Sequence, residues 1–153
     1  YSVEELFKEI ESILGLDKRY KVILIGAGNI GSALAKYENL RNRGFDIISI
    51  FDKREDVVGR DLIGIIVQHI DQLPEFVKNN EVDIAILAVP HSETAKLAEL
   101  VVSLGIKAIW NFSPMDLHFS EDVVIENVHL VDSLMVLGYN LKESRKKAER
   151  RKH

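Results

Sequence analysis

The chain has 153 residues, of which 46% are hydrophobic and 29% are charged, and its formal net charge is −4. This balance predicts a single globular domain with a sizeable core. The lack of cysteine excludes disulfides, thiolate metal sites and a catalytic thiol. The longest apolar run, residues 84–89, is too short to span a bilayer, and the first residues do not resemble a signal peptide. We therefore expect a cytoplasmic protein without a membrane partner.

An amphipathic helix is predicted first, because apolar residues recur at helical spacing through residues 3–14. Ser2 and Glu5 fit a capping box at its start, and Gly15 is a plausible stop. A simple Rossmann unit does not need this helix. We therefore expect it to pack on the flank of the sheet or to lead in from another domain.

The apolar run at residues 20–25 predicts a buried strand that leads directly into a glycine-rich turn. The turn has the pattern Gly-x-Gly-x-x-Gly and consists of Gly26, Ala27, Gly28, Asn29, Ile30 and Gly31. In such a turn Gly26 allows a tight bend, Gly28 lets phosphates approach the backbone, and Gly31 lets the next helix pack closely. The free N–H groups of that helix start would face the pyrophosphate of a dinucleotide. Because the motif alone is weak, its interpretation depends on the strands and helices downstream of it.

Strands and helices alternate along the rest of the chain, which is the pattern of a parallel α/β sheet. Further strands are expected at residues 46–52, 65–67, 83–90, 108–112 and 123–125. Helices are expected from the glycine turn to Gly44, from Asp71, from a Ser92 cap to Gly105, and from near Val128. We predict a Rossmann-type sheet with helices on both faces. The expected divisions are a lead-in helix at 1–19, the dinucleotide-binding domain at 20–127, and a last helix with a basic tail at 128–153.

An acidic residue, Asp52, ends the second predicted strand, 21 residues beyond Gly31. At that place a carboxylate accepts hydrogen bonds from the adenine-ribose hydroxyls and repels the 2′-phosphate of NADP. The alternative is an ordinary aspartate in the turn that ends a strand. Lys53 and Arg54 complicate the choice of cofactor, because a neighbouring cation could accommodate a phosphate. We favour NAD(H).

Two other stretches follow predicted strands at the same edge of the sheet, where ligands of open α/β sheets bind. They are Ala88, Val89 and Pro90 with His91, and Asn111, Phe112 and Ser113 with Pro114. These would surround the ribose and the nicotinamide, although each could also be simple turn chemistry. The predicted cofactor-binding residues are Gly26, Ala27, Gly28, Asn29, Ile30, Gly31, Asp52, Lys53, Ala88, Val89, Pro90, Asn111, Phe112 and Ser113.

No catalytic group stands out. His91 is the best placed histidine, but a histidine there is more often a residue of a helix start, and the chain has no segment large enough for a substrate domain. No two histidines have the spacing of metal ligands on one helix face. We therefore predict a protein that is not an enzyme and that has no catalytic or metal-binding residues.

The last predicted helix carries a leucine stripe and a basic end. Leu130, Leu134, Leu137 and Leu141 either pack on the chain's own sheet or form a dimerisation face. Residues 142–153 hold seven Lys or Arg against two Glu, which indicates a solvated terminus or, less often, a contact with nucleic acid.

These motifs together resemble the C-terminal NAD-binding domain of Rex, the bacterial family of redox-sensing transcriptional repressors. The resemblance covers nearly the whole chain and is carried by the glycine turn with residues 33–37, by residues 43–45, 51–52 and 85–90, and by residues 111–114 and 126–128. It implies a homodimer that prefers NADH and whose last helix is exchanged between subunits. NADH closes such a dimer and releases operator DNA, which is bound through an N-terminal winged-helix domain. It also places Tyr37 and the start of the exchanged helix near the nicotinamide and the hinge.

Two features depart from the family pattern. The winged helix is absent from these 153 residues, so we expect the chain by itself not to recognise an operator, either as a fragment or as a homologue without that domain. His129 stands where many members have an aspartate that takes part in polar switching contacts. The expected switch and dimer residues are Tyr37, His129, Leu130, Leu134, Leu137 and Leu141. The alternatives left open are a small NAD-dependent oxidoreductase centred on His91 and a CoA-binding domain of the acyl-CoA ligase type.

Overall fold

A computed structural model of the chain describes residues 2–14, 18–119 and 122–152. Its helices are α1 (Val3–Leu14), α2 (Asn29–Lys36), α3 (Glu38–Asn42), the 3-10 turn η1 (Ile70–Gln72), α4 (Leu73–Asn79), α5 (His91–Ser103) and α6 (Leu130–Lys152). Its strands are β1 (Tyr20–Ile25), β2 (Phe45–Asp52), β3 (Asp61–Leu62), β4 (Ile65–Ile66), β5 (Gln68–His69), β6 (Ile84–Leu87), β7 (Ala108–Asn111) and β8 (Val124–Asn127).

Six of the strands form one sheet in the order β5-β2-β1-β6-β7-β8, and every neighbouring pair in it is parallel. The chain runs outward from β1 through β2 to β5, and then returns to the other side of β1 for β6. This reversal is the topological switch point of a Rossmann-type fold, at which the loops beyond the carboxyl ends of the strands separate and leave a crevice. The predicted fold class is thus confirmed.

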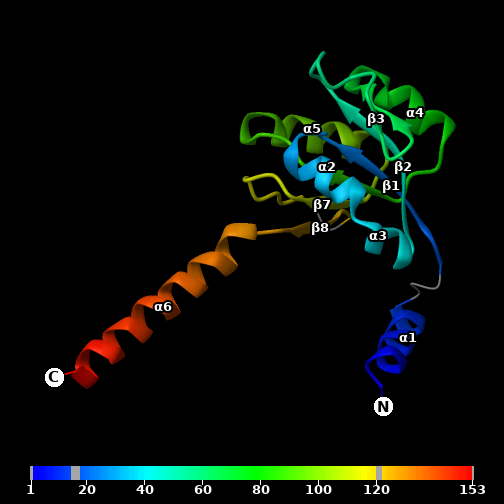
Figure 1. Cartoon of the computed structure of the whole chain (residues 1–153). Coiled ribbons are helices and arrows are strands. Elements are labelled where there is room, and N and C mark those ends of the chain that lie inside the picture. Colours follow the sequence, from blue (N-terminus) through cyan, green and yellow to red (C-terminus); the bar gives the residue numbers. More distant parts are fainter. Residues whose placement is uncertain (1, 15–17, 120–121, 153) are drawn as a thin grey trace.

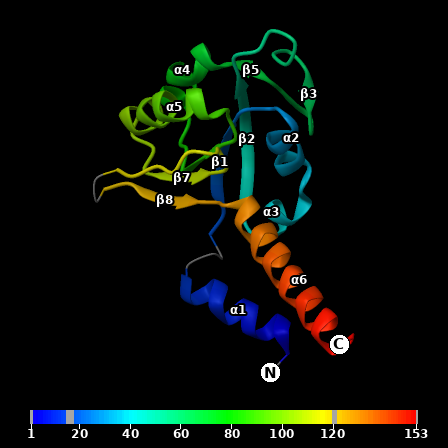
Figure 2. The same cartoon turned by 90° about the vertical axis from the view of Figure 1, so that its left-hand side faces the viewer.

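Both faces of the sheet carry a core, because successive residues of β1 point to opposite sides. Ile23 and Ile25 belong to a cluster that includes Leu73 of α4 and Val101 of α5. Val22 and Leu24 belong to the second cluster, on the side of α2. Figure 2 shows α4 and α5 on one side of the strands and α2 on the other. The expected helices on both faces are therefore present.

Two predicted elements are wrong in detail because local turns interrupt them. The helix after the glycine turn breaks at Tyr37, whose φ of −79° and ψ of 97° are extended, so that α3 turns toward the start of β2. The apolar run at 65–67 is not a strand of the main sheet. Ile63 and Gly64 have positive φ values of 55° and 81°, and they close a two-residue hairpin between β3 and β4. The strand that joins the main sheet is β5 instead.

The cap predicted for the α5 helix also differs, since α5 begins at His91 with Pro90 as its N-cap, and Ser92 lies inside the helix. By contrast, one of the two hydrogen bonds of the capping box predicted for α1 is present: the amide of Glu5 donates to the hydroxyl oxygen of Ser2 at 3.1 Å. The predicted stop at Gly15 lies outside the described residues.

The two terminal helices extend away from the body of the sheet (Figures 1 and 2). Their apolar residues are exposed: Phe7 of α1 is 47% exposed and Leu134 of α6 is 65% exposed. One contact of α1 with the main body is the guanidinium of Arg43, which lies 4.8 Å from the centre of the Phe7 ring. Among the described helices, none combines the length and the apolar character needed to cross a membrane.

Candidate dinucleotide-binding site

The glycine turn between β1 and α2 contains two positions at which any side chain would collide with backbone. Gly26 has a φ of +103°, and a Cβ there would lie 2.2 Å from the carbonyl oxygen of Ala88. A Cβ on Gly31 would lie 1.8 Å from the carbonyl oxygen of Gly26. Only glycine permits this tight bend and this close packing of α2 on the turn.

The middle glycine of the turn, Gly28, faces a side chain rather than backbone. The atoms nearest to a Cβ placed there are two guanidinium nitrogens of Arg54, at 3.4 and 3.9 Å. Gly28 is also the N-cap of α2 and has no side chain with which to satisfy the first N–H groups of the helix. Such unpaired N–H groups, together with the helix dipole, attract anions. The turn therefore offers an anion site beside Gly28.

Asp52 ends β2 next to this turn and is 7% exposed. Its Oδ2 accepts from the amide of Ala27 at 2.8 Å and from Nη2 of Arg54 at 3.0 Å. Its Oδ1 accepts from the amide and from Nε of Arg54, at 2.9 and 3.2 Å. Burial raises the pKa of Asp52, but the hydrogen bonds from Arg54 and Ala27 outweigh burial, and the pKa lies below its ordinary value. The carboxylate thus stays charged and ties β2 to the glycine turn.

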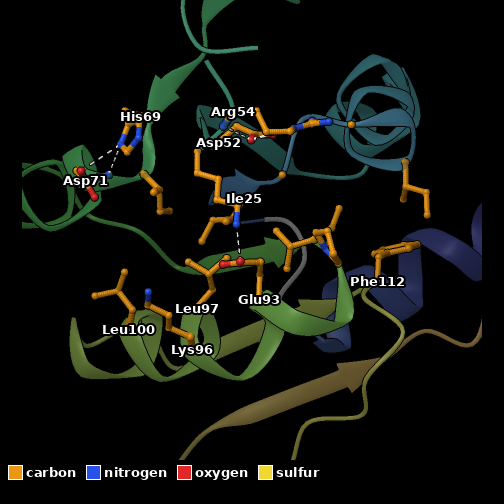
Figure 3. Close-up of a pocket in the computed structure, with 18 of the residues that line it drawn as sticks. Ile25, Asp52, Arg54, His69, Asp71, Glu93, Lys96, Leu97, Leu100 and Phe112 are labelled. Carbon is orange, nitrogen blue, oxygen red and sulfur yellow. Dashed lines mark hydrogen bonds and ion pairs between the residues drawn. The ribbon is translucent and has the colours of Figure 1, made fainter. Parts of the chain in front are cut away.

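A cleft of about 1250 Å³ opens at this edge of the sheet, which is large enough for a dinucleotide. Figure 3 shows Asp52 and Arg54 on one side of it, with Glu93 and Leu97 of α5 opposite. Lys53 and Glu93 form an ion pair that joins the two sides. The cleft is therefore bridged by one pair of side chains in this conformation.

The residues that follow β7 serve mainly to hold their own loop. Asn111 is 1% exposed, and its Nδ2 donates to the carbonyl oxygen of Met115 at 2.7 Å and to Oδ1 of Asn127 at 2.9 Å. Its Oδ1 accepts from the amide of Ser113 at 3.0 Å. Asn111 and Ser113 thus point into the protein, while Phe112 between them lines the cleft.

The structure brings most of the predicted cofactor-binding residues to one cleft. Those that line it are Gly26, Gly28, Asn29, Ile30, Asp52, Lys53, Ala88, Val89, Pro90 and Phe112. Those that do not line it are Ala27, Gly31, Asn111 and Ser113. Two parts of the lining were not predicted from the sequence. One is a wall formed by α5, and its residues are Glu93, Lys96, Leu97 and Leu100. The other lies at the end of β5 and consists of His69, Ile70 and Asp71. The α5 residues have helical spacing of three and four, which could have identified them as one face.

The predicted switch residues lie outside the lining of this cleft. Tyr37 is 58% exposed at the break between α2 and α3. His129 precedes α6, with its Nε2 at 2.6 Å from Oδ1 of Asp116 and its Nδ1 at 3.3 Å from Oδ2 of Asp132. The hydrogen bond with Asp116 holds the pKa of His129 above its ordinary value. His91 is the exposed first residue of α5 and does not line the cleft either.

The leucine stripe of α6 faces solvent. Leu130, Leu134, Leu137 and Leu141 are between 49% and 65% exposed. Within the described part of the chain, no group of three or more histidine, aspartate or glutamate side chains could hold a metal ion.

A Rossmann-type sheet with a glycine turn and an acid at the end of β2 defines the class of dinucleotide-binding domains. The family described as CoA binding domain matches residues 17–115. The redox-sensing transcriptional repressor Rex of Caldicellulosiruptor saccharolyticus is 48% identical over 143 residues, which cover 94% of this chain and 65% of that protein. The Rex of Caldicellulosiruptor bescii is 45% identical over 150 residues, which cover 98% of this chain and 69% of that protein. The chain belongs to the Rex family of redox-sensing transcriptional repressors, and it spans about two thirds of the length of these relatives.

Solved structures of the family have the same fold. RSP, a Rex-family repressor, is 42% identical and matches with a TM-score of 0.87 over 97% of this chain and 72% of its own. RSP in complex with β-NADH matches with a TM-score of 0.88, over the same shares of the two chains. RSP with β-NAD⁺ and operator DNA is 40% identical and matches with a TM-score of 0.85, over 100% of this chain and 70% of its own. The named relatives are repressors and not enzymes, in line with the sequence prediction.

Proposed function

We propose that this chain is the NADH-sensing and dimerisation part of a redox-sensing transcriptional repressor. The observation that carries the proposal is the cleft at the switch point of the sheet, where the glycine turn, the start of α2 and the end of β2 converge. The similarity to RSP, which has been solved with β-NADH and with β-NAD⁺, supports the same ligand for this chain.

In this proposal Gly26, Gly28, Asn29 and Ile30 hold the pyrophosphate, because their backbone lies at the helix start that attracts anions. The adenosine lies at the end of β2, and the nicotinamide lies toward the residues after β6 and beside Phe112. A sensor needs no catalytic group. It needs only a ligand that binds two states of the protein with different affinity. The position of His91 outside the cleft lining favours this role over the oxidoreductase alternative.

Calorimetric titration of the purified chain with NADH and with NAD⁺ tests the sensor directly. We expect NADH to bind more tightly than NAD⁺. Equal affinity for the two would remove the sensing role, because a ligand with equal affinity for two states shifts no equilibrium, however tightly it binds.

A CoA ligand is the second candidate, favoured by the match of the CoA binding domain family to residues 17–115. Thermal-shift measurements with NADH, NAD⁺, NADPH and CoA distinguish the candidates. NADH should raise the melting temperature. A rise with CoA alone would contradict the leading proposal.

We also propose that the chain acts as a homodimer held by α6. Exposed leucines on a helix of 23 residues gain stability only if another apolar surface covers them. A second apolar surface is open on the sheet, where Trp110, Ile84 and Phe45 line a groove of about 320 Å³. Exchange of α6 between two copies would cover exposed apolar area on both.

The three segments then have different tasks. Residues 1–19 lead in from a preceding domain, residues 20–127 bind the cofactor, and residues 128–153 join the two copies. RSP has been solved in complex with operator DNA. In this proposal, an N-terminal winged-helix domain outside the present chain would bind such DNA. Such a regulator works in the compartment that holds the DNA, which in a bacterium is the cytoplasm.

A further inference from the structure

We propose that Arg54 binds a phosphate group carried on the adenosine ribose of the ligand, so that the cleft accepts a ribose-phosphorylated ligand as well as NADH. The shared chemistry is a phosphomonoester, at the 2′ position in NADPH and at the 3′ position in CoA. The inference rests on the proposed function, because it takes the adenosine to lie at the end of β2.

The charge of Asp52 is compensated by its neighbours. A carboxylate at this place normally rejects a 2′-phosphate by its negative charge. Here the carboxylate is 7% exposed and accepts four hydrogen bonds, of which three come from Arg54. A guanidinium that pairs with a carboxylate through two N–H groups neutralises its charge at close range. The repulsion expected from Asp52 is therefore reduced within the protein.

Arg54 lies where a phosphate on the adenosine ribose would arrive. Its Nη2 lies 3.4 Å from the place of a Cβ on Gly28, so the guanidinium covers the glycine turn. The Arg54 side chain is 48% exposed. It engages Asp52 through Nε and Nη2, and the N–H groups on Nη1 take no part in that pair. A half-exposed guanidinium with N–H groups to spare, on the wall of the cleft, suits an incoming phosphate.

The other charged groups near the turn limit the strength of this site. Lys53 already pairs with Glu93 across the cleft, so it fits the role less well. The negative charge of Asp56 acts on Arg54 too, although less than that of Asp52, and a phosphate must compete with both. We therefore expect Arg54 to permit the phosphate with a gain of about tenfold, not to impose a strict preference.

The test is a set of titrations of the chain with NADH, NADPH, CoA and dephospho-CoA. They are carried out for the wild-type protein, for Arg54→Gln and for the control Arg60→Gln. Arg60 is an exposed cation of the same loop that does not line the cleft. The measured quantities are two ratios of dissociation constants, NADPH to NADH and CoA to dephospho-CoA. Circular dichroism confirms that the variants are folded.

We expect Arg54→Gln to raise at least one of the two ratios about tenfold, and Arg60→Gln to change neither. The ratio that rises identifies the source of the phosphate. If NADH binds and neither ratio changes in Arg54→Gln, or if Arg60→Gln has the same effect, the inference is overturned while the proposed function stands. If NADH does not bind and the CoA ratio rises, the proposed function fails and the role of Arg54 stands.

Discussion

A methyl group added at Gly31 would lie 1.8 Å from the carbonyl oxygen of Gly26, whereas one added at Gly138 in α6 would meet nothing within 4 Å. The same substitution should therefore have opposite effects at the two positions. We expect Gly31→Ala to lower the free energy of unfolding by about 3 kcal/mol, because the contact is with backbone. Gly138→Ala should raise it by up to about 1 kcal/mol through helix propensity. Urea denaturation measures both, and equal values for the two variants would contradict the packing described for the turn.

His129 joins the loop after β7 to the start of α6 through Asp116 and Asp132. Its pKa is raised in the folded chain, so the protonated form is the one that stabilises the fold. This contribution is complete below about pH 6.5, the ordinary value in an unfolded chain, and is lost as the pH rises through the higher folded pKa. An NMR titration should give a pKa of His129 above that of a free histidine.

The aspartate variants separate the causes of that shift. We expect Asp116→Asn to lower the pKa of His129 more than Asp132→Asn does, because the hydrogen bond with Asp116 is the larger cause and the charge of Asp132 the smaller one. If both variants leave the titration unchanged, His129 is not held by these carboxylates in solution.

At the scale of elements, α6 has an apolar stripe without a surface to cover it in one copy of the chain. Leu137 is 62% exposed, so a charged residue there should cost a single chain little stability. In an exchanged dimer the same charge would be buried without a partner, which is costly. We expect Leu137→Asp to be monomeric by sedimentation equilibrium, while the control Ser144→Asp, at another exposed position of α6, remains dimeric. A dimeric Leu137→Asp would mean that α6 does not hold the copies together.

Elements defined by strong local signals were predicted correctly, while those decided by turns were not. The apolar run of β1 leads into a glycine pattern that has few alternatives, and both came out as expected. The hairpin between β3 and β4 was missed because Ile63 occupies a position with φ 55°, which a β-branched residue rarely adopts. The side chain of Asp61 supports this turn by accepting from the amide of Gly64 at 2.8 Å.

The candidate site was predictable as far as topology decides it. Parallel strands place their carboxyl ends at one edge, which identified Asp52, Ala88 and Phe112 from the sequence. Which of the residues after a strand face the cleft depends on alternation: Asn111 and Ser113 share one side and Phe112 takes the other. The spacing of the α5 residues could identify one face of that helix, but only the packing of α5 against the sheet decides that this face borders the cleft.

For the molecule as a whole, cofactor binding and cofactor discrimination should be separable. The cleft is lined entirely by residues 25–114, so a chain that ends at Val128 retains every residue of it. We expect this truncated chain to bind ADP-ribose within about threefold of the full chain, because such a difference is below 1 kcal/mol. It should lose its preference for NADH over NAD⁺, since the proposed dimer helix is gone. A retained preference would place the discrimination within a single subunit.

The contact between Trp110 and Phe112 has an optical consequence. The chain contains one tryptophan, and its ring meets that of Phe112 edge-on, with centres 4.5 Å apart. Trp110 lines the open groove of the sheet, while Phe112 lines the cleft. The emission of Trp110 should therefore shift to shorter wavelength when a second copy covers the groove. Quenching of this emission by iodide should fall over the same range of protein concentration in which the wavelength shifts. The protein thus carries its own spectroscopic probe for assembly, at a position one ring away from the cleft.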